Sequence, residues 1–292
     1  MGWPVSSRLS APVDYRAKAM KGLSQLPPFS PILNKLLATL SADDVSFAQL
    51  ADLIEKDTVL AGNVLRMVNS ALCGMRGTIN SVRHAVSIMG MNKLRNTAMS
   101  LSVSRIWRSI DLPADWSPAM FNLHAIAVAI LADLIVQRME VEYPEGAFAG
   151  GLLHDLGMLL VAIALKEEFT AIRRECQSSG RSLADCERER LETDHAELSA
   201  DALAEWNLPA PIQAAVRLHH APVRTDNGSF TLAHVLNAAD SIAILQGVPV
   251  QRWTPPCAAT EEEILQQLGL VGLSSNILED YNREFEAIRN FF

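Results

Sequence analysis

The sequence predicts an all-α protein, because helical signals recur along the chain while strand signals are nearly absent. Aromatic residues make up only 6 % of the 292 residues. No clear run alternates β-branched with polar residues, as a half-buried strand would. In the segment 123–135, apolar residues recur at intervals of three and four, and Asp133 lies on the opposite face. This spacing is typical of a helix that buries one face.

Start and stop signals divide the chain into about a dozen helices of ordinary length. Two capping boxes mark helix starts, Ser46 with Gln49 and Thr260 with Glu263, because each side-chain oxygen can accept from a free backbone amide. Stops are expected at glycine and proline residues. These are Gly74, Gly77, Gly90, Pro113, Pro118, Gly180, Pro209, Pro211, Pro222, Gly247 and Pro249. No repeat of fixed period is present, which argues against a solenoid.

The same signals divide the chain into four consecutive parts. We expect a loose N-terminal arm over 1–22, an N-terminal helical layer over 23–113, a helical core over 114–248 and a C-terminal helical extension over 249–292. The stretch 111–118, with two prolines, is expected to connect the layer to the core.

The composition is that of a globular cytoplasmic protein. Hydrophobic residues account for 49 % of the chain, with 15 Gly and 14 Pro, which excludes collagen-like and disordered classes. The four cysteines are scattered and form no C-x-x-C pair, as expected of reduced thiols. Histidine and aspartate interrupt the two longest apolar runs, 123–136 and 150–165, so we expect neither to cross a membrane.

Charge is distributed unevenly along the chain. The formal net charge of −8 argues against a surface that binds nucleic acid as a whole. The segment 58–110 contains no acidic residue but seven basic ones, so the other 18 basic and all 33 acidic residues give the remainder −15. The basic residues are Arg66, Arg76, Arg83, Lys93, Arg95, Arg105 and Arg108.

Three interpretations of this basic segment stay open. It forms a solvated face, a docking surface for an acidic signalling partner, or ion pairs with acids elsewhere, especially 261–263. Within it, residues 81–99 are only loosely similar to a helix-turn-helix, and a core helix pair fits them better. Nucleic acid is therefore not the expected partner.

Histidines and aspartates in apolar segments are the most informative feature of the sequence. A buried imidazole or carboxylate needs a polar partner or a metal ion, because burying an unpaired charge is costly. Either each residue is hydrogen-bonded separately in the core, or all converge on one or two divalent cations. The residues concerned are His124, His154, Asp155, His195, His219, His220 and Asp240.

This series of residues resembles the HDOD branch of the HD superfamily of metal-dependent phosphohydrolases, which implies a multi-helix bundle of HD-domain type. The resemblance spans about 23–243. It is carried by the segments LPPFSP (26–31), LIEKD (53–57), VLRMVNSA (64–71), AVSIMG (85–90), DHAELSA (194–200) and WNLP (206–209).

The resemblance implies specific ligands. The four core positions of an HD site correspond to His124, His154, Asp155 and Asp240. The second-metal ligands of the branch that hydrolyses cyclic dinucleotides correspond to the remaining histidines, His195, His219 and His220. The implied cation is Fe, Mn, Zn, Ni or Mg. Two departures weaken the link to that branch: Met158 replaces an expected lysine, and Ala-Pro-Val-Arg follows His220.

Two functions are compatible with this resemblance. The first is a bacterial signal-transduction output module that acts through protein interaction, with or without a bound metal. The alternative is a metal-dependent phosphohydrolase or phosphodiesterase in which Asp155 orients the attacking water. The sequence has neither a P-loop nor a G-x-G-x-x-G after a strand, so no nucleotide cofactor is expected.

Overall fold

The structure is a computed structural model that describes residues 13–27, 29–40, 46–69, 79–107 and 110–292. Within these ranges the chain forms helices joined by loops, with no strand, which confirms the all-α prediction. The capping boxes at Ser46 and Thr260 are both present. One helix ends at Gly90, as expected.

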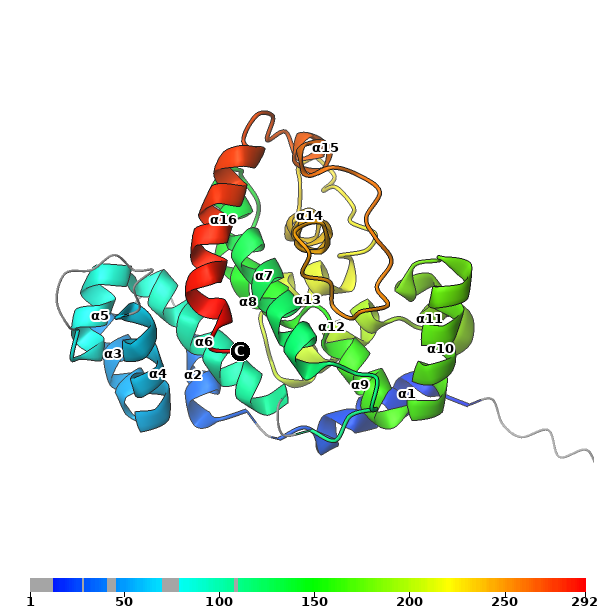
Figure 1. Cartoon of the computed structure of the whole chain (residues 1–292), viewed down its shortest axis with the longest axis horizontal. Coiled ribbons are helices and arrows are strands. Elements are labelled where there is room, and N and C mark those ends of the chain that lie inside the picture. The colour runs from blue at the N-terminus through cyan, green and yellow to red at the C-terminus, as the bar shows by residue number, and fades with distance from the viewer. Residues whose placement is uncertain (1–12, 28, 41–45, 70–78, 108–109) are drawn as a thin grey trace, which may run out of the picture.

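The N-terminal layer consists of five helices, which lie to the left in Figure 1. These are α2 (Pro31–Ala38), α3 (Phe47–Glu55), α4 (Thr58–Val68), α5 (Val82–Met89) and α6 (Met91–Trp107). The loop from Ile110 to Ser117 then leads into the core, where the connector was expected.

The core contains most of the remaining helices. In chain order they are α7 (Pro118–Val136), η3 (Pro144–Gly146), α8 (Ala147–Leu153), α9 (Leu156–Ala164), α10 (Lys166–Ser179), α11 (Leu183–Leu191), α12 (His195–Glu205), α13 (Ala210–Arg217) and α14 (Leu232–Leu245). The C-terminal extension adds α15 (Glu261–Gln267) and α16 (Ser274–Arg289).

The N-terminal arm differs from the expectation. Residues 1–12 lie outside the described residues, but α1 (Tyr15–Met20) and η1 (Lys21–Gln25) are helical. Asp14 caps α1, and Arg16 donates two hydrogen bonds to Asp201 of α12, at 2.7 and 2.8 Å. This part of the expected arm is therefore fixed to the core, which local sequence signals do not reveal because the partner is distant.

Helix α7 is the central element of the molecule. It packs against α8, α14 and α16, and Figure 1 shows it between the N-terminal layer and the α10–α11 pair. The helical stretches Pro118–Val136 and Pro144–Ala164 are long and apolar enough to span a membrane. Their most apolar windows are 78 % and 94 % buried inside the protein, so neighbouring helices already cover them.

Two glycines allow the core helices to approach closely. A Cβ atom at Gly151 of α8 would lie 2.7 Å from the Ala129 Cα of α7. A Cβ atom at Gly157 of α9 would lie 2.1 Å from the His195 carbonyl oxygen at the start of α12. Both contacts are with backbone, which cannot rotate away. The backbone spacings α7–α8 and α9–α12 therefore require glycine at these positions.

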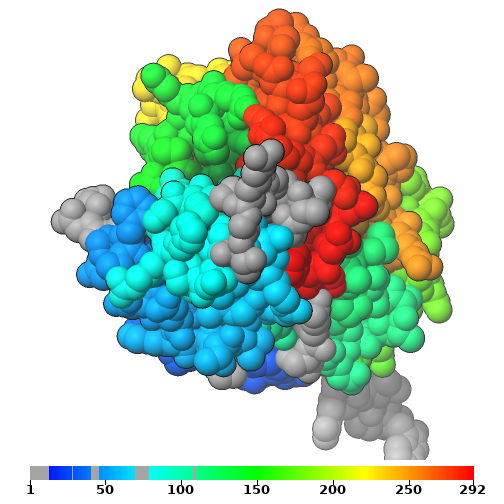
Figure 2. Space-filling view, turned by 60° about the vertical axis from the view of Figure 1, so that its left-hand side comes forward, coloured from blue at the N-terminus to red at the C-terminus, as the bar shows by residue number. Residues whose placement is uncertain are grey.

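Helix α16 connects the extension to the other two parts. Lys93 of α6 donates to Glu284 of α16 at 2.8 Å, and Arg138 after α7 donates to Asp280 of α16 at 2.5 Å. In Figure 2, α16 lies beside the N-terminal layer on one face of the molecule.

We predict that Gly157→Ala destabilises the protein by about 1 to 3 kcal/mol or more, because overpacking at a backbone contact forces α9 and α12 apart. The matched control is Gly62→Ala in α4, where a Cβ atom meets nothing within 4 Å. That change should stabilise by about 0.5 to 1 kcal/mol, the helix-propensity gain of alanine over glycine. Chemical denaturation of both variants measures the difference, and equal stabilities would contradict the packing argument.

Candidate metal centre

The side chains proposed as ligands come from five places in the core and meet at its centre. One comes from α7, two from the break between α8 and α9, one from the first turn of α12, two from the segment after α13 and one from α14. In that order they are His124, His154 and Asp155, His195, His219 and His220, and Asp240. The structure brings together all seven residues.

Four of these residues form what we term the core group. His154 Nε2 lies 3.3 Å from Asp155 Oδ2, and His124 Nε2 lies 3.8 Å from the same oxygen. His124 Nε2 also lies 3.2 Å from Asp240 Oδ1. One ligand atom from each of His124, His154 and Asp155 falls within 4.8 Å of the others, as required for a shared cation.

The second group uses the other oxygen of the same carboxylate. Asp155 Oδ1 lies 3.4 Å from His195 Nε2 and 3.8 Å from His219 Nε2. His220 completes the group, with its Nε2 2.6 Å from His195 Nε2. Asp155 therefore faces one set of imidazoles with each oxygen, which is the arrangement of a carboxylate that bridges two cations.

Backbone carbonyls fix the orientation of three imidazoles. Each of these rings has its Nδ1 within hydrogen-bond distance of a carbonyl oxygen, which only accepts, so Nδ1 carries the proton and Nε2 has a free lone pair. The bonds are His124 to Val248 at 2.7 Å, His154 to Gly151 at 2.8 Å and His219 to Val216 at 2.7 Å. The three lone pairs point into the centre.

These Nε2 atoms are buried, and their nearest polar neighbours are carboxylate oxygens, which cannot donate to a lone pair. A buried polar atom without a partner costs about 1 to 3 kcal/mol. Separate hydrogen bonding in the core therefore does not satisfy the histidines. Neutral imidazole and carboxylate are suitable ligands for Zn, Fe, Mn or Ni, so the donor set fits a divalent cation.

Glu187 is a functional residue that sequence reasoning missed. It lies in α11 with only 2 % of its surface exposed. Its Oε2 accepts from His195 Nδ1 at 2.5 Å and from the His195 backbone amide at 2.8 Å. A carboxylate on the outer nitrogen of a histidine orients the ring and raises its basicity as a ligand. Four of the five residues in its segment, CERER, are charged, which is typical of a solvated helix.

The electrostatics of the centre follow from burial and close charges. Burial lowers the pKa of His195, but the charges of Glu187 and Asp155 outweigh this effect and raise it to about 9. Burial and the neighbouring histidines lower the pKa of His219 to about 4. Burial raises the pKa of Asp155, yet the histidines around it hold that pKa well below its usual range. The Asp155 carboxylate is therefore ionised.

Three of the five basic residues of 58–110 that the structure describes contact acids of the protein itself. Arg83 pairs with Asp52, and Arg105 with Asp57 at 2.7 Å, both within the N-terminal layer. Lys93 pairs with Glu284, while Arg66 donates to Asn63 and Arg95 is half-buried. Arg76 and Arg108 lie outside the described residues.

The acids at 261–263, which the ion-pair interpretation favoured as partners, contact other residues. Glu261 accepts from Gln246, Glu262 from Ser274, and Glu263 caps its own helix. None of the described basic residues of 58–110 forms an ion pair with these acids, and α15 packs against α14 and α16. The acidic partners lie instead in α3, α16 and the turn before α4.

Comparison with known proteins identifies the family. The sequence profile of the HDOD domain matches residues 26–222, which is most of the chain. The chain therefore belongs to the HDOD domain family. A relative from Treponema pallidum, named only as an uncharacterized protein, is 26 % identical over 203 residues. That alignment covers 68 % of this chain but 38 % of the relative, which is a much longer protein.

Solved structures share the fold. An HDOD domain protein with unknown function from Geobacter sulfurreducens gives a TM-score of 0.76 at 22 % identity, covering 95 % of this chain and 98 % of that one. A candidate phosphohydrolase from Shewanella amazonensis gives 0.72 at 22 %, covering 94 % and 98 %. A candidate signal transduction protein from Marinobacter aquaeolei gives 0.72 at 19 %, covering 95 % and 65 %.

We predict that Asp155→Asn lowers metal content at both ligand groups, because its carboxylate faces both. Asp240→Asn should affect only the core group and leave about half the metal of a two-cation centre. Elemental analysis after loading with Zn or Mn measures the stoichiometry. Asp201→Asn, a partly exposed carboxylate paired with Arg16 and Arg217, is the control. Equal metal content in all three variants would rule out this ligand assignment.

Proposed function

We propose that this chain is an output module of bacterial signal transduction in the cytoplasm, which holds divalent cations at its centre and acts on a partner protein. The observation that carries the proposal is the position of Asp155. Its two oxygens face two sets of imidazoles contributed by four regions of the core. A cation bound there would connect α7, α9, α12 and α14 and would stabilise the folded form by mass action.

Burial of the centre favours a regulatory or structural role over turnover. The side chains of His124, His154, His195 and Asp155 are between 0 and 7 % exposed. The Asp240 side chain, at 15 %, is more accessible to solvent. A phosphate ester must reach the cation directly, whereas a cation that fixes the arrangement of helices need not contact any substrate.

A second function, phosphate-ester hydrolysis, is favoured by the completeness of the ligand set. Both the core group and the second group are present, and one solved relative is named a candidate phosphohydrolase. When bound, divalent cations would supply Lewis-acid activation of a phosphate ester. The protein itself would hold an ionised Asp155 between them. Met158, at the position of the expected lysine, is buried and uncharged, so it provides no cation for the substrate.

The surface proposed for the partner is the exposed basic part of the N-terminal layer. Arg83 retains 59 % side-chain exposure despite its contact with Asp52, and Arg66 is also exposed. Exposed ion pairs contribute only about 0 to 1 kcal/mol each, so an acidic partner could replace the internal acids at little cost.

We expect the metal-loaded protein to hydrolyse cyclic dinucleotides far below the ordinary enzyme range of roughly 1 to 10³ per second. The reason is the neutral Met158 and the burial of the centre. Metal loading should nevertheless raise the melting temperature, and a chelator should lower it again. Turnover within the enzyme range that disappears in Asp155→Asn would establish the hydrolase function instead.

We also expect the double change Arg66→Glu with Arg83→Glu to abolish capture of the signalling partner from an extract of the source cells. Stability should fall by no more than about 1 kcal/mol, because both side chains are exposed. Arg181→Glu, which removes an exposed arginine between α10 and α11, is the matched control and should capture normally. Unchanged capture by the double variant would remove the basic surface from the proposal.

A further inference from the structure

Two ligands of the second group are neighbours in the chain. His219 and His220 lie in the turn that follows α13, and their ring centroids are 3.9 Å apart. Consecutive side chains of a regular helix point about 100° apart, so a helix cannot direct two neighbouring rings to one place. Both residues nevertheless offer a ligand atom to the same cluster as Asp155. This arrangement requires a specific orientation of the peptide between them.

Asn237 of α14 bonds to this peptide. Its Nδ2 donates to the His219 carbonyl oxygen at 2.7 Å, and that carbonyl is part of the peptide that joins His219 to His220. The carbonyl lies just beyond the end of α13, where the helix itself no longer provides a donor. Asn237 is half-buried, and α13 and α14 pack against each other, so donor and acceptor are held together. The side-chain amide therefore fixes the plane of this peptide.

His220 depends on this bond more than the other ligands do. An outer acceptor orients each of the other four imidazoles, a backbone carbonyl in three cases and Glu187 for His195. The described part of the chain provides no such acceptor for His220 Nδ1, and the ring bonds through its Nε2 to His195 Nε2, at 2.6 Å. The direction of the His220 ring therefore depends on its backbone, which Asn237 holds.

The position of Asn237 in α14 also connects it to the core group. Asp240 follows three residues later, so both side chains lie on the same surface of the helix. Asp240 Oδ1 lies 3.2 Å from His124 Nε2, whereas Asn237 bonds to the backbone of His219. Helix α14 thus contributes a ligand to one group and a positioning bond to the other.

We propose that Asn237 is a positioning residue that determines whether the centre holds a second cation. Its amide contacts no cation itself, but keeps the peptide of His219 and His220 in the orientation that brings both imidazoles to the second group. The inference rests on the cation-binding function proposed for the centre. Without the amide, His220 loses its fixed direction and the second group loses a ligand, while the ligands of the core group stay in place.

Calorimetric titration of the metal-free full-length protein with Mn²⁺ tests this assignment. We expect Asn237→Leu to weaken binding of the second Mn²⁺ at least about tenfold, the usual cost of losing an outer partner of a ligand, and to leave the first unchanged. Gln213→Leu is the first control, because it removes a bond of the same kind and length, from Gln213 Nε2 to the Leu208 carbonyl oxygen at 2.7 Å.

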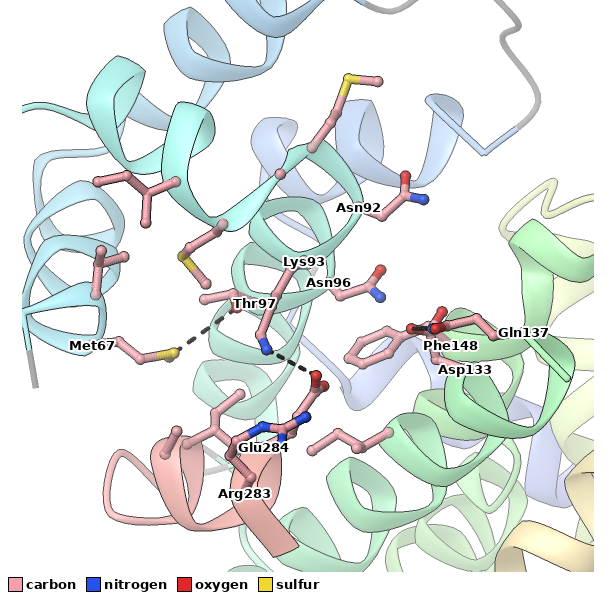
Figure 3. Close-up of a pocket in the computed structure, with 18 residues that line it drawn as sticks. Met67, Asn92, Lys93, Asn96, Thr97, Asp133, Gln137, Phe148, Arg283 and Glu284 are labelled. Carbon is pink, nitrogen blue, oxygen red and sulfur yellow. Dashed lines mark hydrogen bonds and ion pairs between the residues drawn. The ribbon is translucent and has the colours of Figure 1, made fainter. Parts of the chain in front are cut away.

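A second control makes the same replacement away from the metal centre. Asn92 of α6 is exposed and lines the cleft between the N-terminal layer and α16, as Figure 3 shows. Asn92→Leu, like Gln213→Leu, should bind both Mn²⁺ ions with wild-type affinity.

NMR of the metal-free protein separates this inference from the proposed function. With ¹⁵N-labelled histidine, a scalar coupling between His195 Nε2 and His220 Nε2 reports their hydrogen bond. We expect this coupling in the wild type and both controls, and its loss in Asn237→Leu, or in Asn237→Ala if the leucine variant does not fold. This pattern in a protein that binds no Mn²⁺ would contradict the metal centre but support the role of Asn237. A retained coupling, or a second Mn²⁺ bound with wild-type affinity in Asn237→Leu, would overturn the proposal.

Discussion

Burial of one ionised carboxylate is the constraint on which the rest of the core depends. Asp155 is 5 % exposed and lies at the break between two apolar helices, where water cannot compensate its charge. The protein surrounds it with imidazoles from α7, α8, α12 and the segment after α13. Backbone carbonyls and Glu187 orient these rings from outside. The helices that carry these imidazoles are therefore arranged around the same charge.

Close helix packing is what allows that arrangement. Gly151 brings the α8 backbone against α7, which places His154 beside His124. Gly157 brings α9 against the first residue of α12, which places His195 beside Asp155. Ser199 completes this contact, accepting from the Gly157 amide and donating to the His195 carbonyl, both at 2.7 Å. The two glycines thus allow the close helix contacts that bring the histidines to Asp155.

The sequence predicts the parts of this structure that local patterns and family resemblance encode. Apolar periodicity and capping boxes predict helices, and polar residues within apolar helices indicate that those residues must meet. The sequence does not predict Glu187 as a site residue, because its neighbours in the chain are charged. Its carboxylate is nevertheless buried and bonded to His195. Likewise α1 is fixed by Asp201, 185 residues from Arg16, and α16 is connected to α6 by the bond from Lys93 to Glu284. Such features depend on tertiary contacts that no local pattern contains.

X-ray absorption spectroscopy of the zinc- or manganese-loaded protein tests the central claim most directly. The account predicts a first shell dominated by imidazole nitrogen with carboxylate oxygen, at about 2.0 to 2.2 Å for zinc. It also predicts a second metal at about 3.5 to 4 Å, as expected for two cations that share a carboxylate. A shell made only of oxygen, with no imidazole scattering, would show that the cation binds elsewhere and would contradict the account.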